Sequence, residues 1–591
     1  MKIIALANGH DASITALEDG KVLYIWELER VLNKKHFCGV DEGNEIADIL
    51  YNHALPRLGW KVEDIDIIGF AGHSEWRKTE FNGLVPTYKP LEYATPYAEG
   101  RIKLRGSNRE IRCFSVIHHV NHAASAYYTS PFTSSIIYTH DGLGDLVSGI
   151  WGTAHQNKLR IHGELTLKCR EKFGLEPNAI GLTYSYLGRI FPFLRRKNGA
   201  EDLLGTAGKF MGLSSYGKPR EEWRDECRKL LNTWMPDPSS LPNKLGLTQS
   251  ILADFNAQET KDLAATIQDV AECFIIESLR KIKLHATALG DMSSTGLYNL
   301  CMAGGCALNV QINSRILDAH DGSMIVNDKV THFKLFKNLY VPAATSDCGL
   351  SLGCALYIWH HILDNSFEGI KFFNPYLGDT LYNHPETIKD FNEWMNKNYP
   401  TIQFKKHKNM AEASINAAIN LFNNKIIAWI QGRAEAGPRA LGNRSLISNP
   451  CNANSKDVLN AKVKHRETWR PFAPICLKES AEKWFHIDHE QPYMLEAPLA
   501  RKESADLIPA VVHVDNTARV QTVSKDNNGL LYQLLKDFKS LKGVEILLNT
   551  SANDAGLPIL NNLTDALNLL KNTELDLVYV GEYVFSKRPK E

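Results

Sequence analysis

The chain has 591 residues, of which 44% are hydrophobic and 23% charged, proportions typical of a soluble globular protein with two or more domains. Basic and acidic residues number 67 each, so there is no global positive field that would gather nucleic acid. Eleven cysteines without C-x-x-C spacing argue against a zinc ribbon, and no apolar run approaches the roughly 20 residues of a membrane span. These properties predict a cytoplasmic protein with reduced thiols, without nucleic-acid or membrane partners.

The amino-terminal segment predicts a nucleotide-binding core that begins with strands joined by tight turns. Three apolar strands are expected, with Gly9-His10-Asp11 and Asp19-Gly20 as the turns between them, over residues 2–7, 12–17 and 21–26. A second strand, glycine turn and strand follow over residues 134–150. Strand–Asp-Gly–strand sequences are common, but two in this arrangement indicate a duplicated α/β fold of the actin and sugar-kinase type.

Two amino-terminal residues are candidates for chemistry. His10 lies in the first turn, where an imidazole that titrates near neutrality could carry a proton or position a phosphate. A structural turn histidine explains His10 equally well. Lys35 lies in the run Lys34-Lys35-His36 and could contact an anion, although a solvated basic run is the alternative.

The segment SVIHHVNHAAS predicts a metal site. His118 and His122 are four residues apart, which places both imidazoles on one face of a helix. The alternative is a pair of partly buried helix histidines with hydrogen-bonded neighbours. No glutamate follows the first histidine as in H-E-x-x-H, so carboxylates must come from elsewhere, and Asp141 and Asp347 lie in polar turns. Two histidines with carboxylates suit iron(II), manganese or zinc.

Two further segments each predict a polar turn that leads into a helix. These are MAGGCALNVQIN, from Met302 to Asn313, and VPAATSDCGLSLGCAL, from Val341 to Leu356. Backbone amides at such helix starts can bind anions. Tight packing of a helix on a strand explains most glycine clusters of this kind, so each segment alone is weak evidence.

A connector is expected over residues 372–396, because prolines and aromatic residues interrupt the pattern there. After it, strands and helices alternate, which predicts a second α/β domain. Its expected helices cover 410–423 and 563–571, and its expected strands cover 425–430, 519–523 and 544–548.

The stretch from Gln431 to Pro474 predicts a binding site for phosphates. Its cations lie in turn-rich sequence rather than at helical spacing, and they are Arg433, Arg439, Arg444, Lys464, Arg466 and Arg470. Arginine forks and lysine point charges suit a nucleotide or a similar polyanion, whereas a basic loop with surface ion pairs is the alternative. Arg519, Asn549 and Ser551 lie where later strands meet polar turns and extend this cradle. No G-x-x-x-x-G-K-[ST] loop occurs.

Taken together, these motifs resemble the carbamoyltransferase family, which includes tobramycin, cephalosporin and ansamycin carbamoyltransferases and nodulation protein U. The resemblance covers nearly the whole chain. It is carried by GHDAS, ELERVLNKKHF, HHVNHAAS, YTHDGLGD, GKFMGLSSYGKP, AGGCALN, SDCGLSLG, GPRALGNRS, KVKHRETWRPFAP, TARVQTV and LNTSAN, in that order.

The resemblance implies an α/β protein with two domains and two active sites. Residues 1–371 would form an actin-like, metal-dependent domain that transfers a carbamoyl group. Residues 372–591 would form a YrdC-like domain that makes carbamoyl-adenylate from ATP, with Mg²⁺, and carbamoyl phosphate. The acceptor would be a hydroxyl of a small natural product, and a homodimer is the candidate oligomer.

The resemblance also implies roles for individual residues. The positions that match binding of ATP and carbamoyl phosphate are Arg439, Arg444, Lys464, Arg470, Arg519 and Ser551, to which we add Arg466 and Asn549 as neighbours. The metal ligands would be His118, His122, Asp347 and Asp141, with Tyr138 a weaker candidate and iron(II) the favoured ion. Gly304, Gly305 and Asn309 match the adenylate-binding turn. The predicted catalytic residues are His10, as proton acceptor, Lys35, Arg439, Lys464 and Arg470.

Two other functions fit parts of the pattern. The first is threonylcarbamoylation of tRNA, which the zero net charge disfavours. The second is a non-catalytic, actin-like nucleotide-binding scaffold.

Overall fold

A computed structural model describes residues 1–39, 45–72, 96–145, 147–165, 175, 179–196, 198–233, 237–290, 292–326 and 329–589. The chain divides into two compact units. The first comprises Met1–Ile25 and Cys38–Phe373, and the second comprises Trp26–Phe37 and Asn374–Glu591. The second unit thus includes a segment from near the amino terminus. Among the helices of the described residues, none is long and apolar enough to cross a membrane.

The first unit contains two sheets with related strand orders. Its strands are β1 (Lys2–Ala7), β2 (Ser13–Glu18), β3 (Lys21–Glu27), β4 (Ile67–Ala71), β5 (Tyr97–Ile102), β6 (Ile111–Val116), β7 (Ser134–Gly144), β8 (Val147–His155), β9 (Lys158–Glu164), β10 (Asn299–Ala303) and β13 (Asn338–Tyr340). The sheets run β3-β2-β1-β4-β6-β5 and β9-β8-β7-β10-β13. In both, the first strand pairs antiparallel with the next strand and parallel with a later one, as β1 does with β2 and β4, and β7 with β8 and β10. The predicted duplication of an actin-like α/β fold is therefore confirmed.

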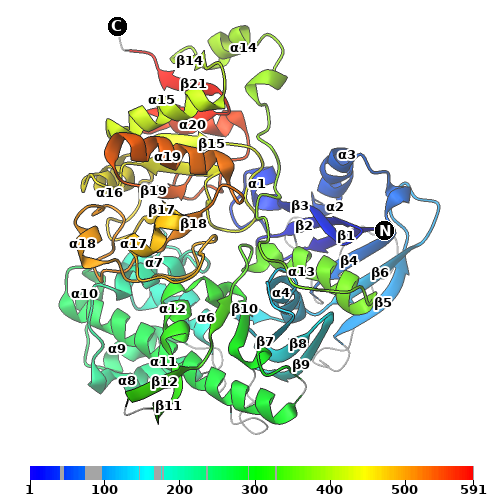
Figure 1. Cartoon of the computed structure of the whole chain (residues 1–591), viewed down its shortest axis with the longest axis vertical. Helices are drawn as coiled ribbons and strands as arrows, with labels where there is room; N and C mark the ends of the chain where they lie inside the picture. The colour runs from blue at the N-terminus through cyan, green and yellow to red at the C-terminus, as the bar shows by residue number, and fades with distance from the viewer. Residues whose placement is uncertain are drawn as a thin grey trace. The chain divides into compact units, whose positions relative to one another are not determined.

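Two buried helices separate these sheets. Helix α4 (His118–Tyr127) packs on β7 and β10, and α13 (Leu350–Leu356) packs on β1, β2 and β4 (Figure 1). The helices also pack on each other, and they approach closely at Gly353. A Cβ atom on Gly353 would lie 1.8 Å from the carbonyl oxygen of Asn121, so only glycine fits there. This contact positions the start of α13 beside the histidines of α4.

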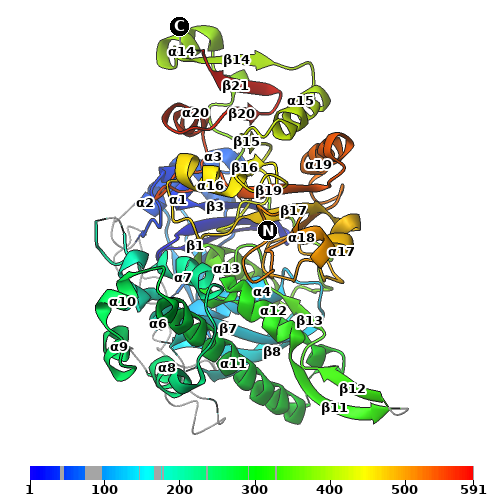
Figure 2. The same cartoon turned by 90° about the vertical axis from the view of Figure 1, so that its left-hand side faces the viewer.

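Helices predominate between β9 and β10 in the first unit. They are α6 (Ile180–Tyr186), α7 (Thr206–Ser214), α8 (Arg224–Asn232), α9 (Leu241–Lys244), α10 (Gln249–Ala253) and α11 (Gln258–Leu289). After β10 come α12 (Val310–Asp318) and the hairpin of β11 (His320–Val326) and β12 (Lys329–Lys334). Figure 2 shows this hairpin extending from the unit beside the long α11.

The second unit is built on one eight-stranded mixed sheet. Its strands are β14 (Ile402–Lys406), β15 (Ile427–Ile430), β16 (Arg444–Ser448), β17 (Ala473–Leu477), β18 (Gln521–Val523), β19 (Ile546–Ser551), β20 (Leu577–Val580) and β21 (Tyr583–Lys587). Their order is β14-β21-β20-β15-β16-β19-β17-β18. The expected strands near 425–430, 519–523 and 544–548 correspond to β15, β18 and β19, and the sequence analysis did not identify the other five.

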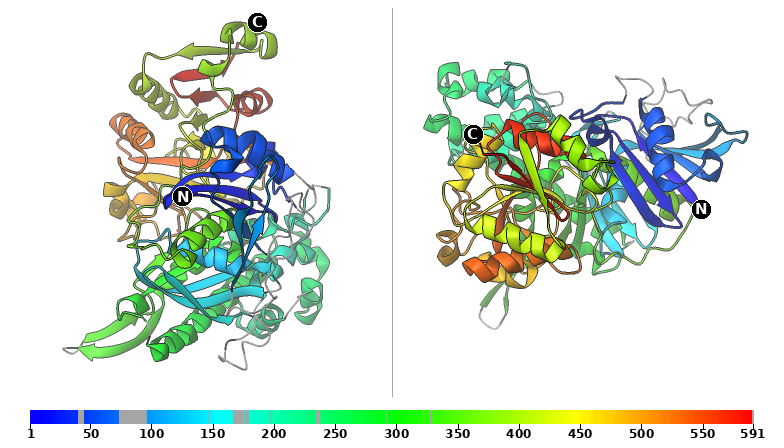
Figure 3. Two further views of the ribbon diagram at one scale, coloured as in Figure 1. Left: turned by 90° about the vertical axis from the view of Figure 1, so that its right-hand side faces the viewer. Right: turned by 90° about the horizontal axis from the view of Figure 1, so that it is seen from above.

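Helices cover both faces of this sheet. On one face lie α15 (Met410–Phe422) and α19 (Gly529–Lys542), which pack on each other, and on the other lies α20 (Leu563–Asn572) (Figures 2 and 3). Each helix begins after an asparagine whose side chain accepts a hydrogen bond from a backbone N–H of the first turn: Asn409, Asn528 and Asn562. The predicted helices at 410–423 and 563–571 are α15 and α20.

Candidate functional site

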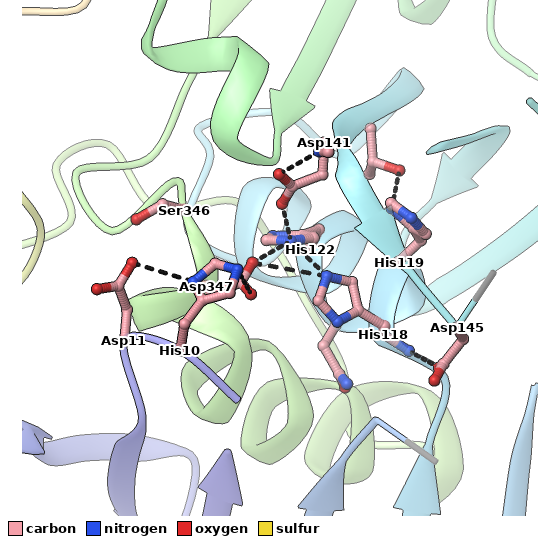
Figure 4. Close-up of polar contacts among 12 residues, drawn as sticks. His10, Asp11, His118, His119, His122, Asp141, Asp145, Ser346 and Asp347 are labelled. Carbon is pink, nitrogen blue, oxygen red and sulfur yellow. Dashed lines mark hydrogen bonds and ion pairs between the residues drawn. The ribbon is translucent and has the colours of Figure 1, made fainter. Parts of the chain in front are cut away.

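Four side chains of the first unit converge on one point. His118 and His122 come from one face of α4, Asp141 from β7, and Asp347 from the turn before α13 (Figure 4). One ligand atom from each of the four lies within 4.8 Å of every other. The predicted metal ligands are therefore brought together. Asp145 accepts a hydrogen bond from the backbone N–H of His118 at 2.9 Å, which fixes the start of the helix.

The distances within this cluster fit a divalent cation. The Nε2 atom of His122 lies 3.2 Å from Nε2 of His118, 3.1 Å from Asp141 Oδ2 and 3.2 Å from Asp347 Oδ1. A single imidazole N–H can donate to only one of these three atoms, so the remaining lone pairs face one another. A cation removes that repulsion, and two imidazoles with two carboxylates are a donor set suited to iron, manganese or zinc.

The pKa values show how strongly the carboxylates act on the histidines. Burial alone would lower the pKa of His118, but Asp347 and Asp141 raise it to about 9. Burial would raise the pKa of Asp141, but His118 and His122 hold it well below its usual range. A bound metal would displace the proton from His118, because a ligating imidazole is neutral.

His10 lies at the edge of the same cluster. Its Nε2 is 3.3 Å from Asp347 Oδ2, and its Nδ1 is 3.4 Å from Asp11 Oδ2. The negative charge of Asp347 raises the pKa of His10 to about 10, despite partial burial. The charge of a metal bound by Asp347 would oppose this shift, and the role of His10 as proton acceptor stays a prediction.

The other histidine of α4 is held outside the cluster. His119 Nε2 lies 2.8 Å from the carbonyl oxygen of Val147, and its Nδ1 lies 3.3 Å from the hydroxyl of Thr139. Tyr138 is fully buried on β7 beside the ring of His140.

The glycines of the AGGCALN turn lie against the metal cluster. A Cβ on Gly304 would meet the carbonyl oxygen of His140 at 2.3 Å, and a Cβ on Gly305 would meet Asp141 Oδ1 at 2.8 Å. Both glycines are therefore needed for close approach of this turn to β7.

The side chain of Asn309 makes its hydrogen bonds within the protein, whereas the prediction was a contact with the ligand. Its side chain caps α12 by accepting from Ile312 N–H, and it exchanges two amide hydrogen bonds with Gln268. The side chain thus orients the helix that follows the turn, and the backbone of the turn remains the candidate contact for an adenylate.

A cluster of cations occupies the second unit. Burial, followed by the charges of Arg519 and Arg470, lowers the pKa of Arg439 well below its usual range. Burial and the same two arginines lower the pKa of Arg466, and burial with Arg470 lowers that of Arg519 to about 10. Glu467, 3.8 Å from Arg470, offsets part of this charge. These four half-buried guanidinium groups are the candidate anion site of the second unit, because a polyanion would relieve their mutual repulsion.

Lys464 is bound by groups of the protein itself. It is buried and donates from Nζ to the carbonyl oxygens of Ser551 (2.9 Å) and Asn553 (2.8 Å) and to the Ser551 hydroxyl (3.2 Å). Its pKa is lowered by burial and then by the charges of Arg466, Arg470 and Lys35, of which Lys35 is exposed. Ser551 thus supports Lys464, and Asn549, also buried, donates to the carbonyl oxygen of Ala440 at 2.9 Å.

Two predicted phosphate-binding arginines bind the protein's own backbone. Arg444 is fully buried, and it donates to the carbonyl oxygens of Gln431 (2.8 Å), Asn443 (2.9 Å), Asp379 (3.1 Å) and Gly432 (3.1 Å). Arg433 donates to the carbonyl oxygens of Gly378 (2.8 Å) and Leu377 (2.6 Å). Their cationic side chains therefore hold the turn together, which corrects the phosphate contact expected of Arg444.

Replacing Arg444 with methionine is expected to destabilise the second unit by about 3–5 kcal/mol, because buried carbonyls and the carboxylate of Glu435 would lose their donor or counter-charge. Urea unfolding followed by fluorescence and circular dichroism measures this loss. The matched control is Lys462→Met, which removes an exposed cation that pairs with Glu574 at 2.7 Å and should not lower the midpoint measurably. An unchanged midpoint for Arg444→Met would contradict the structural role.

Comparison with known proteins identifies the family of this chain. Residues 107–356 match the carbamoyltransferase N-terminus and residues 418–587 match the carbamoyltransferase C-terminus. The chain belongs to the carbamoyltransferase family and is therefore a transferase.

Its relatives include nodulation proteins of rhizobia. Nodulation protein NolNO of Sinorhizobium fredii is 30% identical over 98% of this chain and 79% of its own length. Nodulation protein NolO of Bradyrhizobium diazoefficiens is 31% identical over 80% of this chain and 79% of its own length, and nodulation protein U of S. fredii is 28% identical over 94% of both chains. Among solved structures, HypF of T. kodakarensis is 15% identical, with a TM-score of 0.31 over 61% of this chain and 48% of its own.

Proposed function

We propose that the protein is an ATP-dependent O-carbamoyltransferase that activates the carbamoyl group at one site and transfers it at another. One observation supports this proposal: a single chain of the carbamoyltransferase family contains two candidate sites that suit ligands of opposite charge. One is a cluster of guanidinium groups suited to phosphates, and the other is a two-histidine, two-carboxylate cluster suited to a metal.

The activation step is assigned to the second unit, where Arg439, Arg466, Arg470 and Arg519 would bind the phosphates of carbamoyl phosphate and Mg-ATP. Water cleaves the P–O bond of carbamoyl phosphate, which frees phosphate and carbamate. An oxygen of carbamate then attacks the α-phosphorus of ATP and displaces pyrophosphate, forming carbamoyl-adenylate. The arginines would stabilise the charge that develops on the phosphate oxygens.

The transfer step is assigned to the first unit. The backbone of the AGGCALN turn would contact the adenylate, and His118, His122, Asp141 and Asp347 would hold a divalent metal, for which iron(II) is our candidate. When bound, the metal would supply Lewis acidity to the carbamoyl oxygen. The acceptor hydroxyl attacks the carbamoyl carbon, its proton passes to a base, AMP leaves, and a carbamate ester forms. His10, whose Nε2 lies 3.3 Å from Asp347 Oδ2 at the edge of the cluster, is our candidate for that base.

Purified protein given Mg-ATP and carbamoyl phosphate is expected to release pyrophosphate and phosphate in equal amounts, and to release neither when one substrate is withheld. Coupled enzymatic assays of both products measure this. A hydroxyl-bearing small-molecule acceptor should then gain about 43 Da by mass spectrometry, one carbamoyl group. ATP turnover that does not require carbamoyl phosphate, or no turnover at all, would contradict the proposal and favour a nucleotide-binding scaffold.

A further inference from the structure

The segment Trp26–Phe37, which belongs to the second unit, is anchored there by buried polar contacts. Trp26 Nε1 donates to Asp379 Oδ1 at 3.0 Å. Glu27 Oε1 accepts from the backbone N–H of Gly437 at 2.6 Å, and Arg30 donates to the carbonyl oxygens of Glu435 and Gly437, both at 2.5 Å. Glu27 is 7% exposed and Arg30 6%, so these contacts are shielded from water.

The contacts of Glu27 and Arg30 meet at one turn, Glu435–Gly437, which ends two residues before Arg439. Both the N–H and the carbonyl group of Gly437 are bound by the segment, and the φ of Gly437 is 107°, a conformation that favours glycine. On the far side of Arg439, the backbone N–H of Leu441 donates to Oε1 of Glu435 at 2.5 Å. Arg439 therefore lies in a short loop between Gly437 and Leu441. Both ends of this loop are fixed by hydrogen bonds, and the segment Trp26–Phe37 supplies those at Gly437.

Glu27 and Arg30 also pair with each other, with 3.2 Å between Oε2 and Nη2. A buried ion pair contributes little net stability, because desolvation of the two charges offsets their attraction. Apolar side chains could fill the same space, but they could not bind the two polar groups of Gly437. The pair is therefore better explained by the orientation that it gives to the turn.

We propose that Glu27 and Arg30 are positioning residues for the anion site of the second unit, because they fix the Glu435–Gly437 turn and with it the backbone that carries Arg439. The inference rests on the proposed function of that site.

Kinetics of the full-length protein test this inference. Glu27→Ala and Arg30→Met are expected to lower kcat/KM for carbamoyl-phosphate-dependent pyrophosphate release by about 10²-fold, because a misplacement near 1 Å has effects of that size. Glu27→Gln keeps an acceptor oxygen for Gly437 N–H and should recover at least tenfold of the loss. Arg30→Lys cannot bind two carbonyl oxygens with one planar fork and should be intermediate.

The matched control is Asn33→Gly on the same segment. Asn33 donates a hydrogen bond to Asp565 at 3.3 Å, and its replacement removes this link between the segment and another part of the second unit. The backbone of Asn33 has a φ of 54°, a conformation that glycine adopts readily. Its kcat/KM should remain within twofold of that of the unmodified protein. A loss as large as that of Glu27→Ala would mean that the segment contributes stability alone, and would overturn the proposal.

A binding measurement separates this inference from the proposed function. Titration calorimetry with pyrophosphate should show binding to the unmodified protein and at least tenfold weaker binding to Arg30→Lys, whether or not adenylate is made. If carbamoyl-phosphate-dependent turnover is absent but this difference in binding holds, the proposed function fails and the positioning role stands. If turnover is present and Arg30→Lys and Glu27→Gln match each other and the unmodified protein, the positioning role is wrong. Should Glu27→Ala or Arg30→Met not fold, the two conservative variants Glu27→Gln and Arg30→Lys provide the test.

Discussion

Replacing His122 with alanine is expected to remove the divalent metal from the first unit and to abolish carbamoyl transfer. The His122 Nε2 atom lies 3.1–3.2 Å from a ligand atom of each other member of the cluster, so it occupies the centre of the donor set. Loss of a residue that only supports a ligand costs about 10–100-fold in affinity or activity, and loss of this ligand should cost more. Pyrophosphate release, which is assigned to the second unit, should stay within about twofold.

Two measurements on one preparation test this expectation. Metal content by mass spectrometry should fall from about one ion per chain to near zero, and carbamoyl transfer to a hydroxyl acceptor should disappear. The control is His119→Gln, since His119 lies on the same helix but contacts Val147 and Thr139 instead of the cluster. Full metal content or normal transfer in His122→Ala would contradict the assignment of this cluster.

Replacing Arg439 with alanine is expected to lower carbamoyl-phosphate-dependent pyrophosphate release by about 10²–10³-fold, the usual effect of removing one stabilising donor from a shielded site. Arg519 and Arg470 repel the charge of Arg439. Binding of negatively charged substrate phosphates would offset this repulsion, so we expect Arg439 to contribute strongly to their binding. Metal content should not change, because the cluster of histidines and aspartates belongs to the first unit.

The control for Arg439→Ala is Lys462→Ala. Lys462 is an exposed cation of the same Gln431–Pro474 stretch, and it pairs with Glu574 at 2.7 Å. Its replacement should change pyrophosphate release by less than twofold, since exposed ion pairs contribute little. If Arg439→Ala and Lys462→Ala have the same activity, the arginine cluster is not the activating site.

Local patterns predicted the parts of the molecule that depend on local spacing. The turns around His10 and Asp141 indicated two equivalent groups of strands, and the two sheets have related strand orders. The four-residue spacing of His118 and His122 placed them on one face of α4. Asp141 and Asp347 were candidates because they lie in polar turns, but their separation in the chain gives no information about their distance from the histidines.

Interactions between distant residues could not be predicted in this way. Charge suggested that Arg444 and Lys464 bind phosphate, but their acceptors include backbone carbonyls from other turns, which no local pattern identifies. Asn309 fits the pattern of a helix cap, which is a signal that sequence analysis could have used. The position of Trp26–Phe37 in the second unit depends on contacts across more than half of the chain.

The position of that segment has a consequence for synthesis of the protein. Trp26–Phe37 leaves the ribosome early, whereas the turn that it holds, Glu435–Gly437, is made much later. The first unit can assemble its strands from β4 to β13 as they emerge, but Glu27 and Arg30 must wait for their partners. Folding from the amino terminus onward is the general order during translation. In this chain the second unit is completed last, yet it includes a segment that is synthesised among the first. A product truncated before the second unit would therefore lack the arginine cluster, and its amino-terminal helix would lack the residues that it binds.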